Sequence, residues 1–283
     1  MSQFTGSTYE QAYVWVTLFV TIVSTAAGLV NIAIIRRMKL TGYLELILLM
    51  TFLQLIYDAL VFNSLVQFDP VLTDLVIGGQ FFGGMGSSLV SNWIAFIVVY
   101  IIYFKKSFNI MENYYLIAAS ILGPSALLSL LFFVGLAPHL AYLFFISWNA
   151  YYYGRLVSIF VNFILTGIAL YANFKIRSKK TTRTDAEVAI STLCRRLVYY
   201  PLVQAIGRSG YAWYEFQWGF DFTVPNPHTK PLRFTVLIYS AIVSTFVAVG
   251  YLAIFLRIEP TAWFHFLQLC GIHRERMDSA GGA

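Results

Sequence analysis

The chain alternates long apolar stretches with short polar segments. A helix needs roughly 20 apolar residues to cross a bilayer, and seven stretches approach or exceed that length, at 12–35, 41–67, 77–103, 113–136, 143–174, 193–214 and 232–256. The pattern predicts an all-α membrane protein: a seven-transmembrane helix bundle at 12–257, preceded by an extracellular tail at 1–11. Pro260 would end the last span. The cytoplasmic segment 258–283 is therefore expected to form a short amphipathic helix and a tail.

The composition supports a membrane protein. Of the 283 residues, 59% are hydrophobic and only 11% are charged, whereas about 25% of a soluble domain is charged. Such a chain has too little polar surface to fold as a soluble domain. We expect an integral membrane protein, located in the plasma membrane and in contact with membrane lipid.

The basic residues predict the orientation of the bundle. Fifteen of the 19 Lys and Arg residues fall in the segments that follow the first, third, fifth and seventh spans. Cytoplasmic loops are enriched in Lys and Arg, so the N-terminus is expected outside and the C-terminus inside. The net charge of +6 then reflects membrane topology and not binding to nucleic acid.

Several function classes lack the residues they would need. The seventh span has no lysine for a retinal Schiff base, so no retinal or other cofactor is expected. The four histidines lie in predicted loops or the tail without metal-ligand spacing; they are His139, His228, His265 and His273. No nucleophile and base can be paired, so we expect neither a metal site nor an enzyme.

Four ionisable residues lie within the predicted spans: Glu45, Asp58, Arg155 and Arg208. Counting about 1.5 Å per residue places Asp58, Arg155 and Arg208 in one outer layer, with Gln80 at the top of the third span. Charged residues inside a bilayer are costly and usually mark function. Two interpretations stay open. Asp58 pairs with an arginine or Arg208 snorkels to the headgroups, or the two arginines bind an anionic ligand. In the second case the expected ligand-binding residues are Asp58, Gln80, Arg155 and Arg208.

The sixth span and the basic loops contain the residues that we expect to form a hinge and to bind a cytoplasmic partner. Pro201 should kink the sixth span and act as a hinge. The expected partner-binding residues are Lys105 and Lys106 after the third span, and Arg195 and Arg196 at the start of the sixth.

Several motifs are shared with one family. The third span reads QFFGGMGSSLVSNWIAFIVVY (80–100), with a Gln, the pair Ser87 and Ser88, and Trp93 before an apolar stretch that ends in Tyr. The sixth span begins with RLVYYPL (196–202). These runs resemble the third and sixth spans of the cyclic-AMP receptor-like (class E) G-protein-coupled receptors. ENYYLIAASILGP (112–124) is similar to the family's fourth span, and ISWNAYYYGRLVSIFVNFILTGIALY (146–171) to its outer loop and fifth span.

The resemblance, over about 12–257, implies a receptor that senses an extracellular small molecule and signals through a heterotrimeric G protein. The chain departs from the family in two places. Its third span has no cysteine for the family's usual disulfide to the second outer loop, which here reads ISW (146–148). Its seventh span reads STFVAVGY where the family has a Gln-Gly and Asn-rich signature. A channel or transporter for ions or small solutes is the alternative.

Overall fold

A computed structural model of the chain describes residues 8–39, 41–66, 70–106, 108–178, 185–218 and 230–271. Within these ranges the backbone forms α-helices, connecting turns and one short 3-10 turn, and no strand. The predicted all-α fold is therefore confirmed.

The helices overlap the predicted apolar stretches, except that α9 follows the last stretch and that α6 and α7 share the sixth. They are α1 (Thr8–Ile35), α2 (Gly42–Val66), α3 (Pro70–Phe104), α4 (Tyr114–Gly135), α5 (Ala141–Ser178, after the 3-10 turn η1, Pro138–Leu140), α6 (Asp185–Leu197), α7 (Tyr199–Trp218), α8 (Lys230–Ile258) and α9 (Pro260–Leu269). Five segments, in α1, α3, α4, α5 and α8, are long and apolar enough to cross a membrane. The chain is thus a helical protein with the properties of a membrane protein.

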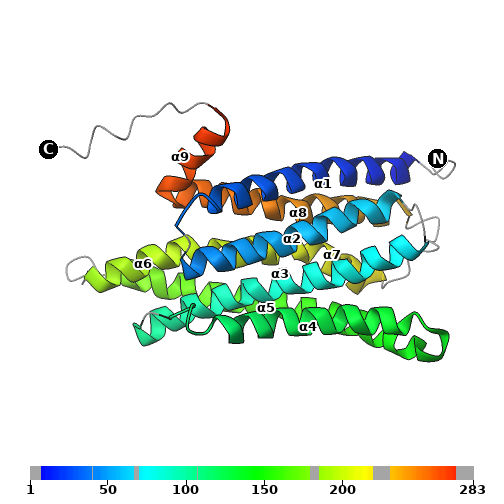
Figure 1. Cartoon of the computed structure of the whole chain (residues 1–283), viewed down its shortest axis with the longest axis horizontal. Helices are drawn as coiled ribbons and strands as arrows, with labels where there is room; N and C mark the ends of the chain where they lie inside the picture. Colours follow the sequence, from blue (N-terminus) through cyan, green and yellow to red (C-terminus); the bar gives the residue numbers. More distant parts are fainter. Residues whose placement is uncertain are drawn as a thin grey trace.

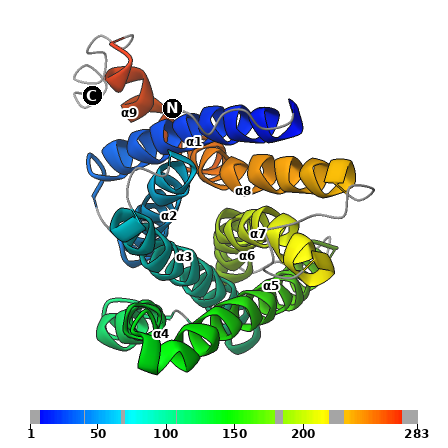
Figure 2. The same cartoon turned by 90° about the vertical axis from the view of Figure 1, so that its right-hand side faces the viewer.

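The long helices form a bundle in which α3 has a central place. α1 packs between α2 and α8, α7 packs against α8 and α5, and α3 contacts α2, α4, α5, α6 and α7. Figure 2 shows this arrangement along the bundle axis. In Figure 1, α1 begins at one end of the long axis and α9 lies at the other.

Small residues let α2 and α3 approach closely. A Cβ atom on Gly83 of α3 would lie 2.7 Å from the carbonyl oxygen of Leu53 and 2.8 Å from the amide nitrogen of Tyr57, both in the backbone of α2. Side chains cannot occupy that space without separating the helices. The glycine therefore serves close helix packing, which is common in membrane bundles.

The predicted sixth span is divided into α6 and α7. α6 ends at Leu197, Val198 is in a turn, and α7 begins at Tyr199. Pro201 has no N–H group to donate to the Leu197 carbonyl four residues earlier, so the helix is interrupted there. The one-residue turn at Val198 lies three residues before the proline, and a bend of the predicted span at Pro201 stays a prediction. α4, in contrast, continues through Pro124.

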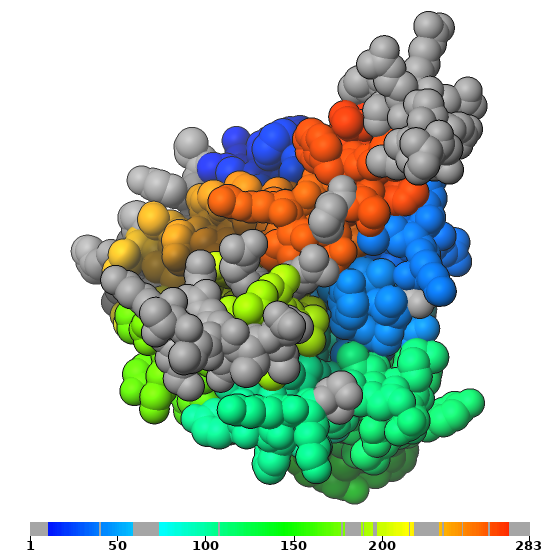
Figure 3. Space-filling model, turned by 90° about the vertical axis from the view of Figure 1, so that its left-hand side faces the viewer, coloured from blue at the N-terminus to red at the C-terminus, as the bar shows by residue number. Residues whose placement is uncertain are grey.

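A short helix follows the last span, as predicted. α9 packs on α8 and α1, and Glu259, the residue before it, accepts a 3.1 Å hydrogen bond from the Tyr43 hydroxyl of α2. Ala262 is buried and Trp263 is half exposed. Figure 3 looks onto this end, with the start of α2 in blue beside α9 in orange-red. The predicted tail residues 1–7 and 272–283 lie outside the described residues.

Candidate functional site

Arg208 of α7 lies in the interior of the bundle, with only 1% of its surface exposed. α7 turns its glycines toward α8, because a Cβ atom on Gly210 would lie 2.9 Å from the Ser240 Cα. The Arg208 side chain is directed instead toward α2 and α3, where its hydrogen-bond partners lie. The polar neighbours on α2 and α3 thus explain why an arginine is tolerated in the interior of the bundle.

Arg208 is connected to Asp58 through an amide. Its Nη2 donates hydrogen bonds to Oε1 of Gln54 (2.9 Å) and to Oγ of Ser87 (3.1 Å). Gln54 uses the other end of its amide to donate to Oδ1 of Asp58 (2.9 Å), one turn away on α2. Ser24 of α1 donates to Oδ2 of the same carboxylate at 2.5 Å. Gln54 therefore links the positive charge on α7 to the negative charge on α2, and Ser24 adds α1 to the same group of hydrogen bonds.

A second branch reaches α3 and α8. Gln204, one turn before Arg208, donates to Oγ of Ser87 (3.2 Å) and of Ser88 (3.4 Å). The Tyr251 hydroxyl of α8 donates to Oε1 of Gln204. We call the connected side chains the central polar network: Ser24, Gln54, Asp58, Ser87, Ser88, Gln204, Arg208 and Tyr251.

Two tyrosines lie between Arg155 and Arg208. The guanidinium carbon of Arg208 is 3.8 Å from the ring centroid of Tyr57, and that of Arg155 is 5.2 Å from the ring centroid of Tyr151. These distances are typical of cation–π contacts. The two rings meet at Gly84, where a Cβ atom would lie 2.5 Å from the Tyr151 hydroxyl and 3.1 Å from Cδ2 of Tyr57. Only a residue without a side chain leaves room for both.

The structure brings three of the four predicted ligand residues together. Asp58, Arg155 and Arg208 are buried around the same tyrosines and Gln54. Gln80 is half-buried on α3, one turn from Gly84. In the structure the Arg208 guanidinium bonds to interior groups and is connected to Asp58 through Gln54.

Uncharged polar residues of the site were missed by reasoning from the sequence. Gln54 precedes Asp58 by four residues, and Gln204 precedes Arg208 by four. Residues four apart share one helix face, so a glutamine at this spacing could have been assigned to the same site as the charge. No comparable sequence pattern predicts that Ser24 bonds to Asp58, since this contact depends on how α1 packs against α2.

Arg208 has donors left over. Among the described residues, no acceptor pairs with its Nε or Nη1 atoms, both of which are buried. A guanidinium with free N–H groups suits a phosphate or carboxylate, which it can bind through two parallel hydrogen bonds. In the described part of the chain, no group of three or more His, Cys, Asp or Glu side chains could hold a metal ion.

The predicted partner-binding residues lie at the end of the bundle that carries α9. Lys105 and Lys106 are exposed directly after α3, and Lys105 has a left-handed backbone with φ of 51°. Arg195 and Arg196 lie in the last turn of α6, with side chains outside the described part.

A cavity of about 200 Å³ lies at this end, between the start of α2, the end of α3, and α6. Leu193 and Leu197 of α6 face Ile97 and Ile101 of α3 across it. The break at Val198 directly follows this wall. Movement of α6 about the break would therefore change the shape of the cavity.

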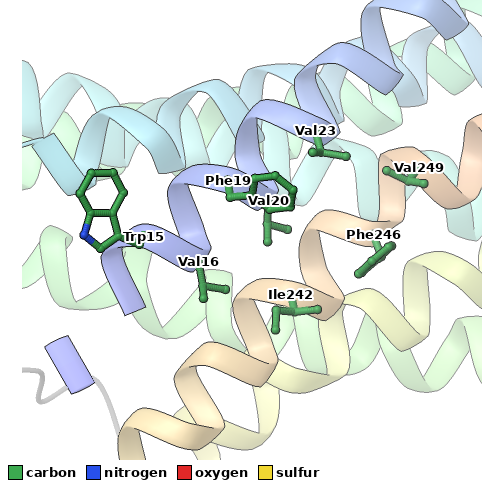
Figure 4. A pocket seen from close by; sticks show the side chains of 8 residues that line it. All are labelled: Trp15, Val16, Phe19, Val20, Val23, Ile242, Phe246 and Val249. Carbon is green, nitrogen blue, oxygen red and sulfur yellow. The ribbon is translucent and has the colours of Figure 1, made fainter. Parts of the chain in front are cut away.

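A different groove, of about 460 Å³, lies between α1 and α8 (Figure 4). Trp15, Phe19 and Val23 line it from α1, and Ile242 and Phe246 from α8. Its lining is hydrocarbon apart from the indole nitrogen of Trp15. An anionic ligand would find no positive charge there, in contrast to the surroundings of Arg155 and Arg208.

Neither protein-family models nor curated proteins match this chain. Its function must therefore be inferred from the central polar network and the elements around it.

Proposed function

We propose that this chain is a seven-transmembrane receptor of the plasma membrane, with its N-terminus outside, that senses an anionic extracellular small molecule and signals to a heterotrimeric G protein. α1 to α5, α7 and α8 would be the seven spans. The observation that carries the proposal is the central polar network, which ties α7 to α1, α2, α3 and α8 just beyond a break in its helix.

Ligand binding would act on the hydrogen bonds of Arg208. An anion that reaches the free Nε and Nη1 donors competes with Gln54 and Ser87 for the same guanidinium. Arg155 lies nearby behind the tyrosine pair and adds a second positive charge. A ligand shifts a conformational equilibrium only by its different affinity for the two states. Here that difference would come from releasing α7 from α2 and α3.

The break before Pro201 would convert this release into movement at the cytoplasmic end. α7 carries Arg208, and α6, on the other side of Val198, lines the cavity. Lys105, Lys106, Arg195 and Arg196 would then form the partner surface. The resemblance to class E receptors implies a G protein as that partner, and the basic end of the bundle supplies a surface for it.

Partner recruitment in cells tests this proposal. Cells expressing the full chain would be exposed to a panel of nucleotides, organic phosphates and carboxylates, and recruitment of a panel of G proteins would be measured. We expect at least one anion to trigger recruitment. Arg208→Ala should raise its half-maximal concentration about tenfold or more, the effect of losing one hydrogen bond to a charged group.

Arg155→Gln provides a second variant if Arg208→Ala fails to reach the surface, and exposed Arg257→Gln is the matched control. Surface expression is measured for each variant. Normal expression with an unchanged response in both buried-arginine variants would contradict the proposed pocket. Recruitment by none of the anions would contradict the ligand class.

A channel or transporter is the second candidate, favoured by one observation. Asp58 of α2 is 3% exposed and accepts a hydrogen bond from Ser24 of α1, and intramembrane carboxylates often carry protons or bind ions in transporters. Purified protein in liposomes, without a partner, should then support ion or proton flux that Asp58→Asn abolishes. A receptor, in contrast, should show no flux under these conditions.

A further inference from the structure

A groove of about 870 Å³ lies on the surface of the bundle where α1, α2 and the start of α4 meet. Leu48 and Phe52 of α2 line it, together with Leu29 of α1 and Tyr114 of α4. Phe52 and Leu29 are both more than half exposed. The groove therefore presents an apolar wall to the surroundings of the bundle.

One end of this groove is charged. Arg36 directly follows the last residue of α1, and Glu45 lies in the first turn of α2; both line the groove. Phe52 and Leu55 lie farther along α2, at about 10 and 15 Å from Glu45 for a rise of about 1.5 Å per residue. That length matches about half of the 30 Å hydrocarbon core of a bilayer. A lipid of one leaflet would thus place its headgroup at the charged end and its acyl chain on the apolar wall.

The two opposite charges select among headgroups. Arg36 suits a phosphate, which it can hold through paired N–H groups. Glu45 suits a primary ammonium, whose three N–H groups donate to a carboxylate. The quaternary ammonium of a choline headgroup has no N–H group, and a glycerol headgroup has no positive charge. We infer that this groove binds a phospholipid that carries both a phosphate and a primary ammonium, as phosphatidylethanolamine does.

The test measures which lipid the protein retains. The full chain is reconstituted in vesicles with equal amounts of phosphatidylethanolamine, phosphatidylcholine and phosphatidylglycerol of identical acyl chains. It is then released, and bound lipids are counted by native mass spectrometry. We expect phosphatidylethanolamine to exceed phosphatidylcholine roughly two- to fivefold, as one partly exposed ion pair allows.

Substitutions of groove residues test whether the preference for the ethanolamine lipid arises in the groove. Glu45→Gln should remove the excess of ethanolamine over choline lipid, Arg36→Gln should lower retention of both, and Leu48→Trp should do the same by filling the groove. Arg37→Gln and Glu112→Gln are matched controls, because both residues are exposed at the same end and neither lines the groove. Thermal unfolding in detergent confirms that each variant is folded.

Three outcomes would overturn the inference: equal retention of all three lipids, a preference for phosphatidylglycerol, or an ethanolamine preference unchanged in Glu45→Gln. Displacement of the retained phospholipid by added cholesterol at equal concentration would also overturn it, since a sterol would then be the better occupant. None of these results bears on the receptor proposal, which depends on different residues.

Discussion

Arg208 stays charged in the interior because neighbouring groups take the place of water. Burying an unpaired charge is very costly, whereas a charge with hydrogen bonds and an opposite charge nearby is tolerated. Gln54 is central to this arrangement, because one amide accepts from Arg208 and donates to Asp58. A glutamate at this position would add a charge, and a leucine would remove both hydrogen bonds.

At this scale we predict that the two charges depend on each other. Arg208→Gln should lower the free energy of unfolding by about 3 kcal/mol, since it leaves the Asp58 carboxylate buried without a positive charge. Adding Asp58→Asn should recover part of that loss, because the double variant buries no net charge. Thermal unfolding of the purified variants in detergent measures both effects.

Arg257→Gln, at an exposed position, should unfold like the unsubstituted chain. Strictly additive effects of Arg208→Gln and Asp58→Asn would show that the two side chains are not coupled, contrary to the hydrogen bonds through Gln54.

At the scale of elements, hydrophobic patterning predicted the long helices well, because the length of an apolar run can be counted from the sequence. The predicted stretch 113–136 and α4 (Tyr114–Gly135) agree to within a residue at each end. Hydrophobic patterning does not give the residue at which α6 ends, Leu197, because Pro201 predicts an interruption of the helix without fixing its position. It also could not find Ser24 as a partner of Asp58, because hydrophobicity does not encode how one helix is rotated against another.

The contact between α2 and α3 leads to a second prediction. Gly83→Ala should lower the unfolding midpoint, because the new methyl group would meet backbone atoms of α2 that cannot move aside singly; overpacking of this kind costs about 1–3 kcal/mol. Gly123→Ala is the matched control, since no atom lies within 4 Å of its Cβ position. Its midpoint should stay constant or rise slightly, as alanine favours a helix over glycine. Equal midpoints for the two variants would contradict the close approach.

The break between α6 and α7 leads to a third. Pro201→Ala restores an N–H group that can donate to the Leu197 carbonyl, so the two helices should join. Backbone amides around Val198 should then exchange with deuterium more slowly, measured by mass spectrometry on peptides covering 194–202. Pro124→Ala should change exchange in α4 much less, because that helix is already continuous. Unchanged exchange around Val198 would show that tertiary packing, and not the proline, causes the break.

At the scale of the whole molecule, the two ends of the bundle differ in chemistry. The start of α1 lies at one end, while α9, the α6 segment and the exposed Lys105 and Lys106 lie at the other. Because basic residues favour the cytoplasmic side, the second end should face the cytoplasm. An odd number of crossings would place the chain ends on opposite sides.

This orientation can be tested in intact cells. An epitope tag placed before Ser2 should bind antibody without permeabilisation, and a tag placed after Ala283 should bind only after it. Each tagged chain should keep normal surface expression, measured by surface biotinylation. Binding of both tags from the same side would contradict seven crossings, and with them the receptor proposal.

The chain has only two cysteines, and their surroundings differ: Cys194 is buried in α6, and Cys270 is exposed just after α9. A thiol-reactive fluorophore should therefore attach to the unmodified protein at one place. That place follows α9, and the residue before α9, Glu259, is hydrogen-bonded to Tyr43 of α2. The unsubstituted chain thus offers a position for an optical probe, and changes at the end of the bundle that carries α9 could be followed in real time without any substitution.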